Sequence, residues 1–375
     1  MDWIVPNRGL MQKLRMGLVG AGLVGQAEHA YYLWDDSTRF DFVGLADASA
    51  AVRSAVAARY GIRSVYAKFE DLLAAGIDAV VIAAPDAFHP ALVVKALEAG
   101  LHVLCEKPLA LTVEGCDEIA AARDRTGRIV QIAYMKRHDP AYKQALTYLP
   151  TRIEAVKLIS VEVNDPDQDP FVTHLPMTWP SDLPVGLREK ARTLTFEQLC
   201  AGAQAELGES ALRAAGNGFL SALVHDVAVV RGMVAHMGGK LPEAASQGAI
   251  FDDGRGVQLG FGLPGGGRVT MTHLNLPGVP DYNERISVYC EDRIIELVFP
   301  SPYLRHFPTQ LKVKQAGNGH ALVTTDHRAS YEEAFREQLR AFHSAAIGEA
   351  PVETTVEEAR SDVALLTSAL VKAIA

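Results

Sequence analysis

The stretch LRMGLVGAGLVG, residues 14–25, decides the fold of this chain. An apolar run ends there in the pattern G-x-G-x-x-G, formed by Gly20, Gly22 and Gly25, and a helical pattern follows from about residue 23 to residue 34. The glycine pattern alone is weak evidence, but a strand before it and a helix after it are its proper context. In that context the backbone turns sharply and a pyrophosphate sits at the helix N-terminus. The stretch therefore predicts a dinucleotide-binding α/β domain.

A carboxylate stands where such a domain binds ribose. Asp47 ends the next apolar run, 22 residues after Gly25, close to the roughly 20 residues expected of a ribose-binding acid. Because a carboxylate accepts hydrogen bonds from a free 2′-hydroxyl and repels a 2′-phosphate, NAD is favoured over NADP, although Arg53 is near enough in sequence to meet a phosphate. A methyltransferase can share such an acid, and a helix-capping aspartate would give the same pattern. A protein-kinase glycine loop would require H-R-D and D-F-G motifs, and neither occurs in the sequence.

The order of predicted strands and helices changes near residue 140, which divides the chain into two parts. Strand and helix alternate up to that point, which predicts a parallel sheet with right-handed crossovers. Beyond it come a strand at 153–163, a segment rich in proline and aspartate at 164–187, and then hairpins with tight glycine turns at 248–323, which imply antiparallel pairing. We therefore predict a Rossmann domain with a doubly wound parallel sheet over 1–140, with an extension at 1–13. An α+β domain is predicted over 141–375, and its final helices are candidates to pack back on the first domain. The helices predicted in the second part are 196–213, 218–237, 330–347 and 354–374.

Composition excludes several classes of protein. Of 375 residues, 49% are apolar and 22% charged, as in ordinary globular proteins. The net charge of −9 provides no positive field for nucleic acid or anionic lipid. The first dozen residues lack the apolar core of a signal peptide, and no uncharged apolar run approaches the roughly 20 residues of a membrane helix. The four cysteines form no C-x-x-C pair, so neither a disulfide framework nor a metal site is expected. We predict a soluble cytoplasmic protein.

Further motifs suggest a family. The chain reads APDAFHP at 84–90, HVLCEKP at 102–108 and IAYMKRHDPAY at 132–142. Together with the glycine loop, the helix around His225 and the C-terminal helix from Tyr331 to Phe342, these motifs resemble the glucose–fructose oxidoreductase / inositol dehydrogenase / rhizopine-catabolism (Gfo/Idh/MocA) family. The Glu-Lys-Pro after a strand is the most specific of them. The resemblance implies a Rossmann domain followed by a domain with an open, mostly antiparallel sheet. It also implies NAD(P)-dependent oxidation or reduction of sugars, polyols or related small molecules, in homodimers or homotetramers.

The same motifs indicate where the chemistry lies, because ligands of an open parallel sheet sit beyond the carboxyl ends of its strands. In the family the lysine matching Lys107 is catalytic, often beside a cis Lys–Pro bond. Its ammonium would stabilise the alkoxide that develops as hydride leaves the substrate. The alternative is a solvated lysine paired with Glu106. The residues expected at the cofactor are Gly20, Ala21, Gly22, Leu23, Val24, Gly25, Asp47, Ala84, Pro85, Asp86, His89, Glu106 and Lys107. For His89, opening the helix at Pro90 is an equally good explanation.

A polar line on the predicted helix 218–237 supplies the second half of the site. Ser221 and His225 lie four residues apart and so share one face. The family usually carries aspartate and histidine in this arrangement, with the histidine as general acid/base. Here serine replaces the aspartate, and a hydroxyl neither holds a substrate by a charged hydrogen bond nor raises the basicity of the histidine. A buried helix histidine is the alternative explanation for His225. The substrate contacts expected are Lys107, Tyr134, Lys136, Ser221 and His225.

Three functions remain open on the sequence. The first is an NAD-dependent dehydrogenase acting on a carbinol carbon of a sugar, polyol or cyclitol. The second is a redox-neutral enzyme that retains NAD, oxidises a sugar transiently, eliminates a substituent and reduces the ketone again. The third is a catalytically inactive NAD-binding relative that lost its activity with the change to Ser221. The segment 164–215 is a candidate lid or substrate wall.

Overall fold

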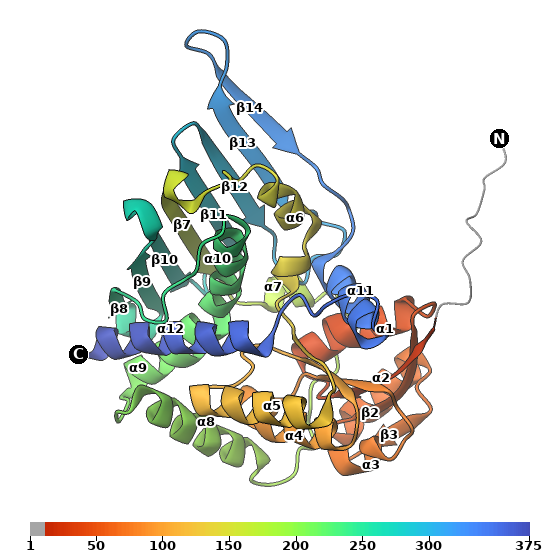
Figure 1. The fold of residues 1–375 in the computed structure, drawn as a ribbon. Helices are drawn as coiled ribbons and strands as arrows, with labels where there is room; N and C mark the ends of the chain where they lie inside the picture. Colours follow the sequence, from red (N-terminus) through yellow and green to blue (C-terminus); the bar gives the residue numbers. More distant parts are fainter. Residues whose placement is uncertain (1–11) are drawn as a thin grey trace, which may run out of the picture.

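The computed structural model describes residues 12–375, so residues 1–11 of the expected extension lie outside the described part of the chain. The described chain builds a six-stranded sheet and an eight-stranded sheet (Figure 1). The predicted fold class is confirmed: a doubly wound α/β unit precedes a unit with a mostly antiparallel sheet.

The first sheet is parallel throughout, in the order β3-β2-β1-β4-β5-β6, which is the Rossmann order. The residues of β4 are apolar and buried along its whole length, as expected for a strand covered on both faces. The strand order reverses between β1 and β4, where a ligand crevice forms at the carboxyl ends. The strands are β1 (Leu14–Val19), β2 (Phe40–Ala46), β3 (Ser64–Tyr66), β4 (Ala79–Ile82), β5 (His102–Cys105) and β6 (Val130–Ile132).

The helices of this unit begin and end where the sequence places cap residues. The Ser49 side chain accepts a hydrogen bond from the Val52 amide at the start of α2, and Gly61 ends that helix in the left-handed region at φ 69°. Thr112 and Gly127 do the same for α5. Local capping residues therefore account for the ends of both helices without contacts from distant parts of the chain. The helices are α1 (Ala30–Asp35), α2 (Ala50–Tyr60), α3 (Phe69–Leu73), α4 (His89–Glu98) and α5 (Val113–Thr126).

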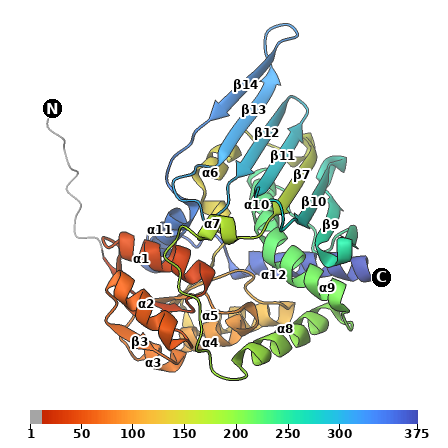
Figure 2. The same cartoon turned by 180° about the vertical axis from the view of Figure 1, so that it is seen from behind.

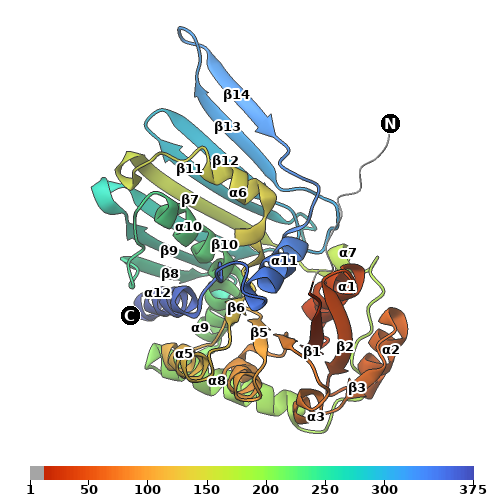
Figure 3. The same cartoon turned by 45° about the vertical axis from the view of Figure 1, so that its right-hand side comes forward.

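The second sheet has the order β14-β13-β12-β11-β7-β10-β9-β8. Only the β7–β10 pair is parallel, and the other neighbours are antiparallel. Helices α6 and α10 lie on one face of this sheet (Figures 1 and 3), whereas in Figure 2 no helix of residues 12–375 stands in front of its other face. The strands are β7 (Val156–Asp165), β8 (Gln247–Phe251), β9 (Gly256–Gly262), β10 (Arg268–Asn275), β11 (Asn283–Cys290), β12 (Arg293–Phe299), β13 (Gln310–Ala316) and β14 (Leu322–His327).

The C-terminal helices join the two units. Thr354, just before the last helix, donates its hydroxyl to the carbonyl of Ile132 at the end of the Rossmann sheet, and its own carbonyl accepts the Ile132 amide. The last helix then lies against α5 and α10 (Figure 3). The helices of the second part are α6 (Pro140–Leu146), α7 (Asp169–Val172), α8 (Leu187–Ala203), α9 (Glu209–Arg213), α10 (Val224–His236), α11 (Ala334–Ala346) and α12 (Val356–Ile374).

The region predicted as a helix over 196–213 is the main departure from expectation. Helix α8 begins nine residues earlier, at Leu187, and ends at Ala203, where Gln204 takes a left-handed conformation with φ 52°. The helical run Glu209–His236 is long and apolar enough to span a membrane by composition, but 78% of its most apolar window is buried inside the protein. That burial is the pattern of a core helix.

A buried ion pair ties the last helix to α10. Arg231 and Asp362 approach to 2.5 Å, with side-chain exposures of 8% and 0%. Removing one partner leaves an uncompensated buried charge, so Asp362→Ala is expected to lower the free energy of unfolding by about 3–5 kcal/mol. Denaturant unfolding measures this loss. The matched control is Asp117→Ala, which breaks an ion pair between half-exposed side chains and should cost less than about 1 kcal/mol. Equal losses in the two variants would contradict the assignment.

Candidate active site between the two units

The glycine loop has the geometry of a pyrophosphate cradle. Gly20 adopts φ +83°, and a Cβ there would lie 2.4 Å from the Ala83 carbonyl oxygen. A Cβ on Gly25 would lie 2.4 Å from the Gly20 carbonyl oxygen. By contrast, a Cβ on Gly22 would meet no atom of the described chain within 4 Å. Two glycines therefore serve the turn and its packing, while Gly22 leaves backbone open to a ligand, as the dinucleotide motif requires.

A cavity of about 730 Å³ opens from this loop, within the size range of cofactor sites. Its walls include Gly20 and Gly22, and then Ala84 and Pro85 after β4. Asp47 stands at the far end, where its carboxylate accepts the backbone amides of Ala21 and Ser49, both at 2.8 Å. Six of the thirteen residues expected at the cofactor line this cavity, namely Gly20, Ala21, Gly22, Asp47, Ala84 and Pro85. Leu23 and Val24 instead turn into apolar clusters beside it.

A segment of the second unit closes over this cavity. Residues 166–186, which we call the strap, leave β7 and cross the Rossmann unit to α8 (Figure 2). Gln26 holds the strap by exchanging hydrogen bonds with the backbone of Thr178, at 2.8 and 3.1 Å. Val172 and Leu175 pack against Ala27. The segment predicted as a candidate lid therefore lies on the nucleotide side of the cleft.

Glu106 and Lys107 follow β5, the neighbour of β4. The Glu106 carboxylate accepts a hydrogen bond from His29 at 2.7 Å. Burial alone would raise the pKa of Glu106, but the contact with His29 and the charge of Lys107 lower it, so this carboxylate is ionised. The Lys107 side chain points across to the second unit, where its ammonium donates to the carbonyl of Ser221 at 2.8 Å. The peptide bond from Lys107 to Pro108 is cis. Lys107 is therefore not a solvated lysine paired with Glu106.

His225 lies one helical turn beyond that carbonyl. It follows a π-helical segment, Ala214–Leu223, an irregularity that is frequent at functional sites. Its Nδ1 atom is buried and finds no hydrogen-bond partner within residues 12–375. Burial and the positive charges of Lys107 and Lys136 hold the pKa of His225 well below its ordinary value. The imidazole is thus neutral at pH 7.

Acidic and basic side chains from the second sheet complete the surroundings. Lys136 is buried and paired with Glu284, which also accepts the Tyr282 hydroxyl. Both carboxylate oxygens of Asp226 are buried without a partner in the described chain. Burial, and then the neighbouring Glu284, raise the pKa of Asp226 well above its usual range, which favours its protonated form. The sequence analysis missed Glu284 and Tyr282, because they lie far from the motifs and carry no motif of their own.

The structure does not bring every expected residue to the cleft. Tyr134 is 1% exposed, and its hydroxyl lies in the interior near Asp362 and Cys116, where burial and those charges raise its pKa. The expected substrate contact of Tyr134 is therefore corrected. His89 is completely buried, and its ring nitrogens contact the carbonyls of Pro108 and Ala84, both at 2.8 Å. His89 thus positions the loop that carries Lys107 and does not face the cofactor cavity. Asp86 lies beside Lys107, and burial raises its pKa.

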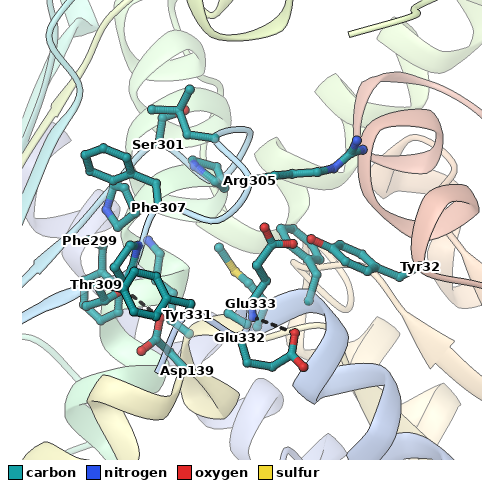
Figure 4. A pocket seen from close by; sticks show the side chains of 18 residues that line it. Tyr32, Asp139, Phe299, Ser301, Arg305, Phe307, Thr309, Tyr331, Glu332 and Glu333 are labelled. Atoms are coloured by element: carbon teal, nitrogen blue, oxygen red, sulfur yellow. Dashed lines mark hydrogen bonds between the residues drawn. The ribbon is translucent and has the colours of Figure 1, made fainter. Parts of the chain in front are cut away.

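A second cavity, which Lys136 helps to line, lies between the 299–309 loop and the residues before α11 (Figure 4). Arg305 and Glu333 border it. Its volume of about 60 Å³ holds a few water molecules at most. It is too small for a sugar or a polyol. Within residues 12–375, no group of three or more His, Cys, Asp or Glu side chains is arranged to hold a metal ion.

Residues 14–134 match a family model described as an oxidoreductase family with an NAD-binding Rossmann fold. This is the model of the Gfo/Idh/MocA family, so the resemblance expected from the sequence is confirmed over residues 14–134.

Individual relatives agree over the same region. The chain is 44% identical over 132 residues to inositol 2-dehydrogenase 1 of Saccharopolyspora erythraea. The aligned region covers 34% of this chain and 39% of that protein. It is 39% identical over 139 residues to inositol 2-dehydrogenase/D-chiro-inositol 3-dehydrogenase of Shouchella clausii. This alignment covers 36% of this chain and 40% of that protein. The matched region thus spans about two fifths of the length of these relatives.

Solved structures extend the likeness of fold to nearly the whole chain. UDP-N-acetylglucosamine 3-dehydrogenase from Acidithiobacillus ferrooxidans superposes with a TM-score of 0.69 at 18% identity, covering 96% of this chain and 98% of that one. Myo-inositol 2-dehydrogenase from Lactobacillus plantarum superposes with a TM-score of 0.67 at 19% identity, and the superposition covers 94% of each chain. At these identities the comparison concerns the fold alone.

Proposed function

We propose that the chain is an NAD-dependent oxidoreductase that transfers hydride between nicotinamide and a carbinol carbon of a sugar, polyol or cyclitol. The observation that carries this proposal is the position of Lys107. Its ammonium reaches across the cleft to the Ser221 carbonyl, 2.8 Å away, and its charge acts on the neutral His225. Lys107 and His225 are thus close enough for the charge of one to act on the other, and neither is among the residues that line the cavity containing Asp47.

The roles of the side chains follow from their charges. When bound, NAD supplies the hydride acceptor, held by the glycine loop and Asp47. Neutral His225 accepts the hydroxyl proton of the substrate. The Lys107 ammonium stabilises the negative charge that develops on the same oxygen. Glu106, ionised and fixed by His29, keeps a compensating charge beside Lys107. The Asp47 carboxylate favours a free 2′-hydroxyl on the cofactor, and therefore NAD over NADP.

The acid limb of the pH profile tests the role of His225. Because burial and two lysines lower its pKa, His225 remains a base below its ordinary pKa of about 6.5. In the direction of alcohol oxidation, kcat/KM is expected to fall only below that pH. Lys136→Gln removes one positive charge and should shift the acid limb of kcat/KM to higher pH. The matched variant Lys240→Gln, at an exposed lysine, should leave the limb at the wild-type pH. A wild-type limb above pH 7 would contradict this role.

The strap gives one observation in favour of the redox-neutral alternative, because its contacts with Gln26 and Ala27 cover the cofactor cavity and would slow the exchange of NAD. A panel of inositols, sugars and glycosides distinguishes the two functions. Accumulation of NADH supports the dehydrogenase, and product formation without NADH supports the retaining enzyme. No conversion of any substrate, with or without added NADP, would contradict both.

The setting of the enzyme is also part of the proposal. We infer a cytoplasmic protein with a small-molecule substrate. We also infer that the helix-free face of the eight-stranded sheet (Figure 2) mediates assembly into a homodimer or homotetramer.

A further inference from the structure

The strap places an acidic side chain, Asp182, at the start of α2. This carboxylate accepts the hydroxyl of Ser49 and, at 3.0 Å, the backbone amide of Ala51. Both donors belong to the start of α2, directly after β2 and Asp47. They are the groups that a helix N-terminus offers to an anion. In this structure, the anion is supplied by the second unit of the same chain.

Asp182 lies close to Asp47, because both carboxylates bond to the same residue. Ser49 joins them, since its amide donates to Asp47 at 2.8 Å and its hydroxyl donates to Asp182. Pro180 lies two residues before Asp182 and Leu183 directly after it, and both line the same cavity as Asp47, whereas Asp182 itself does not. The hydrogen bonds from Ser49 and Ala51 lower the pKa of Asp182, so the carboxylate is charged.

We propose that Asp182 determines the preference of this enzyme for NAD over NADP, by occupying with its own carboxylate the donors at the start of α2 that a cofactor 2′-phosphate would need. This inference rests on the proposed function, because it assumes that a dinucleotide binds in the cavity. It adds a residue from the second unit to a selection that the sequence pattern assigns to Asp47 alone.

The charges nearby explain why a second carboxylate has an effect. Arg53 lies in the first turn of α2 and donates to the Asp47 carbonyl at 2.5 Å, and Arg188 and Lys190 of α8 line the cavity. Three cationic side chains would otherwise favour a phosphate in this region. With Asp182 in place, a 2′-phosphate meets carboxylates from both units and finds Ser49 and Ala51 already engaged.

The test is the binding of NADH and NADPH to the full chain, followed by the fluorescence of the reduced nicotinamide. The wild type is expected to bind NADH more tightly. Asp182→Asn should tighten NADPH by about tenfold, while the Kd of NADH stays within about threefold. Asp182→Ser should act in the same direction. The matched control is Asp167→Asn, at an exposed acid of the strap that does not bond to Ser49 or Ala51 as Asp182 does, and it should change neither constant.

The outcomes separate this inference from the proposed function. An unchanged ratio of the two dissociation constants in both Asp182 variants would overturn the inference and leave the dehydrogenase proposal standing. A wild type that already prefers NADPH would overturn it as well. A wild type that binds neither nucleotide would overturn both proposals. Since the Asp182 side chain is exposed at the surface, both variants are expected to keep the melting temperature of the wild type.

Discussion

Lys107→Met is expected to lower kcat by about 10²–10³-fold, the loss typical of removing a group that stabilises a developing oxyanion. The methionine keeps most of the length of the side chain and lacks the ammonium. Contacts of NAD with the glycine loop and Asp47 do not involve this group, so the Kd of NAD should stay within a few-fold. The loss therefore falls on the chemical step.

The control for this variant is Lys240→Met, which replaces an exposed lysine and should leave kcat unchanged. A circular dichroism spectrum and melting temperature like those of the wild type show that the Lys107 variant is folded. The catalytic role of Lys107 would have to be withdrawn if Lys107→Met retained more than about a third of the wild-type kcat. That is a far smaller loss than the one expected for removing an oxyanion-stabilising group.

Gly22→Ala is expected to weaken NAD binding by at least about tenfold, or about 1.4 kcal/mol, without destabilising the fold. A Cβ at Gly22 meets no atom of residues 12–375 within 4 Å, so the apoprotein accommodates it. It projects into the space where a pyrophosphate must approach the backbone. Isothermal titration and thermal unfolding together measure the two effects.

Gly25→Ala provides the contrasting control in the same loop. Its Cβ would lie 2.4 Å from the backbone oxygen of Gly20, so the loop must shift, at a cost of about 1–3 kcal/mol in stability. The melting temperature should fall in Gly25→Ala and not in Gly22→Ala. Loss of stability in both variants would mean that Gly22 serves packing and not the cofactor.

The Rossmann unit could be predicted in detail because its signals are local. The glycine loop, the capping residues and the fully apolar β4 each lie within a few neighbouring residues, and so does the spacing to Asp47. The Glu106-Lys107-Pro108 motif indicated the catalytic edge for the same reason. The catalytic role of this motif stays a prediction.

The rest of the site depends on contacts between distant parts of the chain. Asp182 meets Ser49 across 133 residues, and Lys136 meets Glu284 across 148. No periodicity or spacing reports such pairs. Tyr134 was misplaced because the end of a strand does not fix the direction of its side chain, and the hydroxyl turned inward toward Asp362. Helix α8 was placed too late because its first half is polar and gives little apolar pattern.

Transfer of deuterium tests the central claim most directly. The full chain is incubated with NAD and with inositols and sugars deuterated at their carbinol carbons, and the reduced cofactor and the products are analysed by mass spectrometry. We predict that one deuterium appears on the nicotinamide ring with at least one of these substrates, and that Lys107→Met abolishes the transfer. Tight binding of NAD with no deuterium on the nicotinamide, either free or protein-bound, would contradict hydride transfer and favour a catalytically inactive NAD-binding protein.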